Sequence, residues 1–68
     1  MRNRKSLLTP RALEALKLLS IGNNYPQVAR KMCISYQTAK NYGSLILERL
    51  HAKNRAHAVA KAKDRGII

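Results

Sequence analysis

The sequence predicts an all-α domain, a compact bundle of four helices separated by short breaks. Apolar residues recur at spacings of three and four along the chain, which is the period of a helix and not of a strand. Residues that favour helix starts or ends, such as Thr, Asn, Ser and Gly, stand at each break. With 68 residues the chain has room for one domain and a marginal core.

The first helix is expected over residues 10–21. Thr9 is a favourable N-cap, and Pro10 fits the first helical position, where its missing N–H group is not needed. An apolar stripe follows, and Gly22 is expected to end the helix. The stripe consists of Ala12, Leu13, Ala15, Leu16 and Leu19.

The second helix is short and is expected over residues 25–32. Asn24 and Gln27 have the spacing of a capping box, and Pro26 falls in the first turn, where it is tolerated. Cys33 then stands between two apolar residues and is expected to be a small buried or half-buried residue, with a reactive thiol as the alternative. A single cysteine excludes an intramolecular disulfide and fits a reducing cytoplasm. The inward positions are Val28, Ala29 and Met32.

The third helix is expected over residues 36–50, with Ser35 as its N-cap and two different faces. Gly43 lies in its middle, where glycine costs about 1 kcal/mol relative to alanine. It therefore suggests that the second helix or a sugar-phosphate backbone approaches closely there, the alternative being a tolerated imperfection. The apolar face carries Ala39, Tyr42, Ile46 and Leu50, and the polar face carries Gln37, Lys40, Asn41 and Ser44.

The fourth helix is expected over residues 55–65, capped by Asn54 and ended by Gly66. It is rich in alanine, and Val59 is its one bulky apolar residue. Residues 1–7 carry three basic side chains and are expected to form a flexible basic arm, which leaves residues 8–68 as the folded domain.

The charge balance indicates a polyanionic partner. The chain has 14 Lys and Arg residues against 3 Asp and Glu, a net charge of +11, which favours nucleic acid first and an anionic membrane second. No apolar run is long enough to span a bilayer, and the N-terminus lacks the apolar core of a signal peptide. No acid pair, triad or metal-ligand set is present, so neither an enzyme nor a cofactor is expected. His51 and His57 stand apart as ordinary surface residues.

A short second helix, a tight turn and a longer third helix make a helix-turn-helix. The chain resembles the LuxR/FixJ/GerE-type DNA-binding domain of bacterial transcription regulators, from Leu8 to Ile68. Ala12 departs from the family's usual Glu, and Ser44 with Leu45 leave the outer face with fewer charges than usual. The matching segments are LTPRALEALKLL at 8–19, VARKM at 28–32, Ile34-Ser35, TAKNY at 38–42, RAHAV at 55–59 and GII at 66–68.

The resemblance implies sequence-specific binding of double-stranded DNA in transcription regulation, with the third helix in the major groove. Lys40 matches the family's Lys and is expected to contact guanine, unless it is solvated or contacts phosphate alone. Asn41 suits adenine, and Ser44 suits a base or a phosphate. Glu14 is expected to form an ion pair with a basic residue of the third helix.

Phosphate contacts are expected at the positive end of the third helix dipole and on the second helix. The alternatives are core packing for Thr38, surface packing for Tyr36 and a solvated face for the second helix. The expected phosphate contacts are Ser35, Tyr36, Gln37, Thr38, Arg30 and Lys31.

A weak dimer, formed on DNA, is implied through the last helix. Its expected contact residues are Ala58, Val59 and Ala62, unless the alanines only pack the domain's own core.

The alternative function is a module similar to sigma-factor region 4, which would bind RNA polymerase as well as promoter DNA. The expected location is the bacterial cytoplasm, at the nucleoid. The sequence fits both an excised C-terminal domain and a stand-alone regulator, and no pattern in it specifies the operator, the direction of regulation or the controlling signal.

Overall fold

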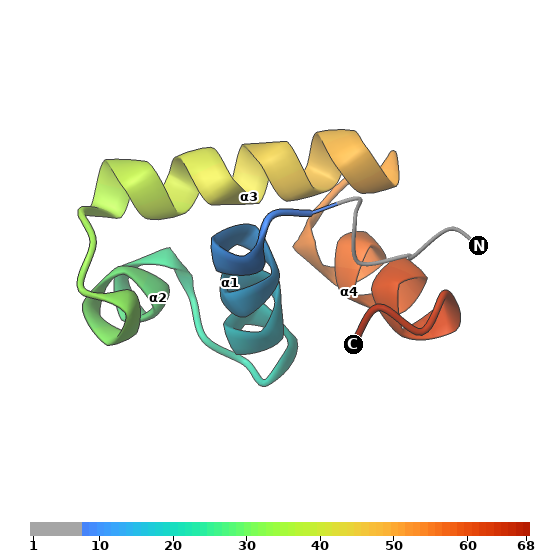
Figure 1. Cartoon of the computed structure of the whole chain (residues 1–68), viewed down its shortest axis with the longest axis horizontal. Coiled ribbons are helices and arrows are strands. Elements are labelled where there is room, and N and C mark those ends of the chain that lie inside the picture. Colours follow the sequence, from blue (N-terminus) through green and yellow to red (C-terminus); the bar gives the residue numbers. More distant parts are fainter. Residues whose placement is uncertain (1–7) are drawn as a thin grey trace.

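The computed structural model describes residues 8–68 and confirms the all-α prediction (Figure 1). Helix α1 spans Pro10–Ser20, α2 spans Tyr25–Met32, α3 spans Tyr36–Leu50 and α4 spans Arg55–Asp64. Residues 8–68 contain no strand. The first and last helices end one residue earlier than predicted, because Ile21 and Arg65 are C-caps. The basic arm predicted over residues 1–7 lies outside the described residues.

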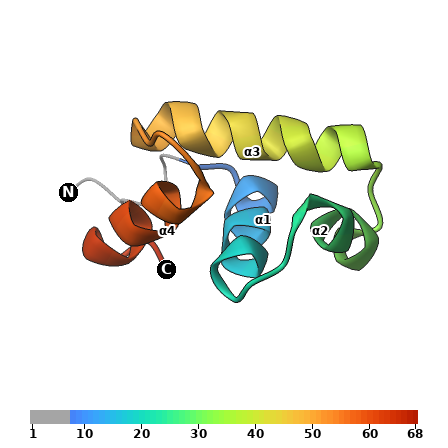
Figure 2. The ribbon, with the colours of Figure 1, turned by 180° about the vertical axis from the view of Figure 1, so that it is seen from behind.

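Helix α3 is the element on which the other three helices pack. It runs along the longest axis of the domain, and α1, α2 and α4 all lie on one side of it (Figures 1 and 2). Helix α1 lies in the middle, with α2 and α4 on either side of it. The other side of α3 therefore contacts no helix of residues 8–68.

Each helix starts at a side chain that accepts a hydrogen bond from the backbone of its first turn, which satisfies a donor that has no intrahelical partner. The capping box of α2 is confirmed: Asn24 and Gln27 accept from each other's backbone N–H at 3.0 and 2.8 Å. No helix has an acidic residue in its own first turn, so none of the four dipoles is offset from within its own helix start. The four N-caps are Thr9, Asn24, Ser35 and Asn54.

The core lies under α3 and receives side chains from all four helices. The segment after α4 also contributes, because Gly66 adopts a positive φ of 73° and the Ile67 N–H donates to the Ala62 carbonyl at 2.8 Å. Ile67 is thereby folded back and buried. The buried apolar residues are Leu8, Ala12, Ala15, Leu16, Val28, Ala29, Met32, Ala39, Ile46, Leu50, Ala58, Ala62 and Ile67.

Helices α2 and α3 approach closely at Gly43. The Tyr25 ring occupies the space that a side chain at position 43 would need, since a Cβ built there would lie 2.6 Å from Tyr25 Cε1. The Arg55 guanidinium lies over the same ring, with its Cζ 5.2 Å from the ring centroid. Gly43 is therefore explained by the packing of α2, which decides between the possibilities that the sequence leaves open.

The turn between α2 and α3 is held by Cys33 and Arg11. Cys33 adopts a left-handed conformation, with φ 58° and ψ 45°, and ends α2. Arg11 of α1 donates from Nη2 to the Met32 carbonyl at 3.0 Å, which satisfies an acceptor at the end of α2. The prediction that Cys33 is buried or half-buried is wrong: its side chain is exposed, and the inward space is taken by Met32 before it and Ile34 after it.

Arg11 also holds the acid that was expected to contact α3. Glu14 forms its ion pair with Arg11, three residues earlier in α1, at 3.0 Å between Oε1 and Nη1. The expected pairing of Glu14 with a basic residue of the third helix is therefore replaced by a pairing within α1. Both side chains are about half-exposed, so this pair contributes at most about 1 kcal/mol to stability.

Gly43→Ala is expected to destabilise the domain by about 1–3 kcal/mol, because the new methyl group overlaps the Tyr25 ring. The free energy of unfolding in urea measures this loss. In a Tyr25→Ala background the same substitution should instead stabilise by about 1 kcal/mol, the ordinary gain of alanine over glycine within a helix. A stabilisation of the otherwise unchanged protein by Gly43→Ala would contradict the proposed packing.

Candidate nucleic-acid interface

The free side of α3 carries the polar residues predicted for it. Lys40, Asn41 and Ser44 are exposed there, at spacings that place them on one face of the helix. Leu45 does not belong to this face, contrary to expectation, because it is half-buried and packs against the core. The buried residues on the opposite side of α3 are Ala39, Gly43, Ile46 and Leu50, and Tyr42 is half-buried beside them.

Two of the exposed side chains are paired with a residue one turn earlier. Lys40 Nζ lies 5.5 Å from the centroid of the Tyr36 ring, a cation–π contact. Gln37 Nε2 donates to Asn41 Oδ1 at 3.0 Å. The i, i+4 spacing that brings each pair together is visible in the sequence, although neither contact is among the predictions. Two of the three candidate base-contacting side chains, Lys40 and Asn41, are thus held by neighbours on their own helix.

The start of α3 presents backbone donors to the solvent. Ser35 Oγ accepts from the Thr38 N–H at 3.0 Å and lies 2.8 Å from Thr38 Oγ1, so the two side chains satisfy each other. The N–H groups of Tyr36 and Gln37 precede the first intrahelical hydrogen bond and are free to bind an anion. Thr38 is half-buried, whereas Ser35, Tyr36 and Gln37 are exposed.

The charged side chains of α2 and of the first half of α3 are all positive. Arg30 and Lys31 are exposed in the last turn of α2, where they also complement the negative end of that helix dipole. No Asp or Glu occurs between Glu14 and Glu48, so α2 and most of α3 contain no acid. An approaching polyanion therefore meets only cations on α2 and on the first half of α3, while the nearby Glu14 carboxylate of α1 is paired with Arg11 at the end of α2.

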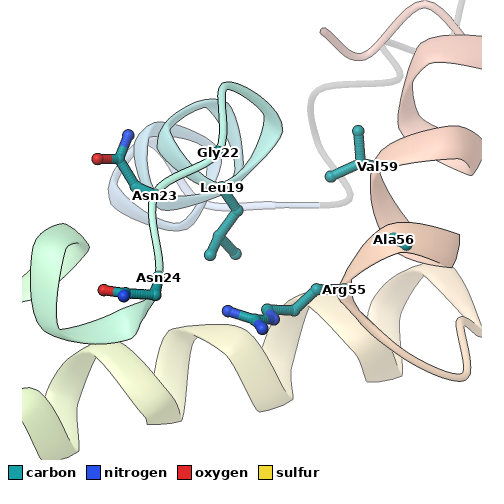
Figure 3. A pocket seen from close by; sticks show the side chains of 7 residues that line it. All are labelled: Leu19, Gly22, Asn23, Asn24, Arg55, Ala56 and Val59. Atoms are coloured by element: carbon teal, nitrogen blue, oxygen red, sulfur yellow. The ribbon is translucent and has the colours of Figure 1, made fainter.

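A cavity of about 300 Å³ lies between the end of α1 and the start of α4 (Figure 3). Arg55 extends into it from α4 and is its one charged lining residue, while Leu19 and Val59 supply apolar surface. Acid–base chemistry needs paired titratable groups, which this lining lacks. The remaining lining residues are Gly22, Asn23, Asn24 and Ala56.

The residues expected at a dimer contact are only partly available. Ala58 and Ala62 have 1% and 0% of their surface exposed, because they face the core of their own domain. Val59 is half-buried, packs against the core and lines the cavity beside α1 with Ala56, and Ala56 and Ala60 on the same face are exposed. An exposed patch therefore cannot include the two core alanines.

Within residues 8–68, no group of three His, Cys, Asp or Glu residues is placed to bind a metal ion. In the same range no helix has the length and apolar character needed to cross a bilayer.

Comparisons with known proteins agree on one family. Residues 6–62 match the bacterial regulatory proteins of the luxR family. The chain is 41% identical over 59 residues to the transcriptional regulatory protein DesR of Bacillus subtilis (strain 168), across 87% of the chain and 30% of DesR. It is 38% identical over 62 residues to the transcriptional activator protein CarR of Pectobacterium carotovorum subsp. carotovorum, across 91% of the chain and 25% of CarR.

A third relative is the uncharacterized transcriptional regulatory protein YvfU of Bacillus subtilis (strain 168). The identity is 36% over 61 residues, across 90% of the chain and 30% of YvfU. The chain thus spans less than a third of the length of each of these relatives.

Proposed function

The chain belongs to the luxR family of bacterial regulatory proteins, and from that premise we propose that α3 enters the major groove of operator DNA and reads base edges. It is a LuxR-type domain of transcription regulation, which acts by binding DNA and is not an enzyme. The observation that carries the proposal is the row of exposed polar side chains on the free side of α3, next to a second helix that carries no acid.

Three side chains make the proposed base contacts. The Lys40 ammonium donates to guanine O6 and N7, and the Asn41 amide pairs with adenine N6 and N7. Ser44 lies one turn beyond Lys40 and contacts a base or a phosphate. The Tyr36 ring supports the Lys40 ammonium before DNA binds, so less side-chain freedom is lost on binding.

The start of α3 and the end of α2 make the proposed phosphate contacts. The N–H groups of Tyr36 and Gln37 bind one phosphate, helped by the helix dipole. Arg30 and Lys31 contact phosphates from α2, since both are exposed and cationic. Ser35, Thr38 and the hydroxyl of Tyr36 complete the set proposed from the sequence.

Two copies of the domain bind adjacent half-sites about 10 bp apart, because a major groove faces the same side of DNA once per turn. The proposed contact between copies is the accessible part of α4 around Val59, with the exposed Ala56 and Ala60. Its small side chains offer little apolar area, so the dimer is weak and forms on DNA. The site of action is the bacterial cytoplasm, at the nucleoid.

Lys40→Ala is expected to weaken binding to the preferred sequence by about 1–3 kcal/mol and to relax the preference at one base pair. Fluorescence anisotropy with the preferred site and its single-base variants measures both effects. Lys17→Ala is the matched control, since Lys17 is exposed in the last turn of α1, the end farther from α3. If Lys40→Ala lowered the affinity equally for the preferred site and all its variants, Lys40 would contact phosphate and not a base.

The affinity is expected to fall with salt, because each phosphate contact releases a counterion. With roughly 4–6 contacts per monomer, a plot of log K against log of the salt concentration should have a slope of about −4 to −5. Arg30→Ala should make the slope less steep by about 1 if Arg30 contacts a phosphate. An unchanged slope would show that Arg30 makes no phosphate contact.

Selection of bound sequences from a random DNA pool tests the proposal as a whole. Enrichment of a palindrome with half-sites about 10 bp apart is expected for a dimeric reader. No enrichment, together with tight binding to RNA polymerase, would instead support the sigma-region-4-like alternative.

A further inference from the structure

We infer that Glu48 raises the specificity of the domain for its preferred sequence, because its carboxylate repels phosphates when α3 lies on an unrelated sequence. The inference rests on the proposed entry of α3 into the major groove. It adds to the base contacts of Lys40, Asn41 and Ser44 a residue that acts by repulsion. Such a residue penalises incorrect complexes, whereas the base contacts stabilise the correct one.

Glu48 belongs to the row of exposed side chains on the free side of α3. Each member of this row precedes a buried position by two residues, which is a rotation of about 200° around the helix and therefore the opposite side. Glu48 is the one acid of α3. The row consists of Gln37, Asn41, Ser44 and Glu48, and the buried positions are Ala39, Gly43, Ile46 and Leu50.

The folded domain gains no stability from this carboxylate. Glu48 lies in the last turn of α3, where the negative end of the helix dipole disfavours an acid. Its side chain forms no hydrogen bond or ion pair within residues 8–68, whereas Glu14 is paired with Arg11. A stabilising contact therefore does not explain an acid on the side of the helix proposed to face a polyanion.

The position of Glu48 along α3 places it near the far edge of the groove. The backbone N–H of Gln37 is proposed to bind a phosphate, which lies at one edge. With a rise of about 1.5 Å per residue, Glu48 is about 17 Å farther along the helix axis, whereas the major groove is about 12 Å wide. The second half of α3, which lies over α4 and away from α2, therefore reaches the phosphates of the opposite strand (Figures 1 and 2).

The repulsion discriminates between sequences because α3 is held differently on each. On unrelated DNA the domain is held by phosphate contacts alone, and the carboxylate penalises any position that brings the whole of α3 close to the backbone. On the preferred sequence the bonds of Lys40 and Asn41 to base edges hold the first half of α3 in the groove, while the second half is free to tilt away from the opposite strand. Glu48 thus lowers the affinity for unrelated DNA more than the affinity for the preferred site.

Glu48→Gln tests the inference, because it removes the charge and keeps the size and the helix propensity of the side chain. The two affinities to compare, at one salt concentration, are those for the most enriched duplex of the random pool and for a shuffled duplex of the same length. The affinity for the shuffled duplex should rise about tenfold and that for the enriched duplex about twofold, so their ratio should fall about fivefold. Glu48→Lys should lower the ratio further.

Asp64→Asn is the matched control. Asp64 is exposed in the last turn of α4, and the substitution changes the net charge of the domain by the same amount. It should raise both affinities by the same factor and leave their ratio unchanged. The urea midpoint of the Glu48→Gln domain should be no lower than that of the unsubstituted domain, and a lower midpoint would contradict the absence of a stabilising role.

Two results on DNA would overturn the inference. If Glu48→Gln weakens binding to the enriched duplex and removes the preference at one C·G pair, the carboxylate accepts a hydrogen bond from cytosine N4 and does not act by repulsion. If Glu48→Gln changes the ratio no more than Asp64→Asn does, Glu48 is an ordinary solvated side chain. Equal binding of both duplexes by the unsubstituted domain would instead mean that the proposed function itself fails.

Discussion

The helix-turn-helix depends on one close contact, the Tyr25 ring of α2 against Gly43 of α3. A ring at this position requires a glycine opposite, and the glycine lowers the intrinsic stability of the helix that carries it. The contact holds α2 beside the first half of α3, while Arg11 holds the other end of α2 through the Met32 carbonyl. The orientation of α3, and hence the direction of its free side, follows from these two attachments.

Affinity and specificity come from different parts of the domain. The free side of α3 has Lys40 as its one cation among the proposed base contacts, and most of the positive charge lies elsewhere. Charge spread over the surface attracts any nucleic acid, and the few side chains on α3 must then distinguish one sequence from another. Side chains already held by neighbours on the same helix suit this task, because fewer of their rotamers are lost on binding.

The helix bounds and caps are predictable from the sequence because they are local properties. Thr9, Asn24, Ser35 and Asn54 act on backbone groups within their own first turn, so their type and spacing suffice. Contacts between different helices are harder to predict from the sequence. Whether Gly43 allows the close approach of α2 or of a phosphate can be decided only from the position of Tyr25, which lies on another helix.

Two further differences have the same origin. Cys33 has apolar neighbours in the sequence, yet the left-handed backbone at the end of α2 turns its side chain outward. Ala58 and Ala62 suit a partner's surface as well as their own core, and only the packing of α4 decides that they face inward. The proposed base and phosphate contacts remain predictions, since their residues are exposed and only the nucleic acid would define their partners.

The unneutralised helix starts have a consequence for how the domain responds to ionic strength. With a net charge of +11 and no acid in the first turn of any helix, the folded domain repels itself, and added salt should stabilise it by screening that repulsion. Salt acts in the opposite direction on the complex with DNA. Folding and binding are therefore coupled most strongly in dilute salt, where the free domain is least stable and a polyanion supplies the missing negative charge.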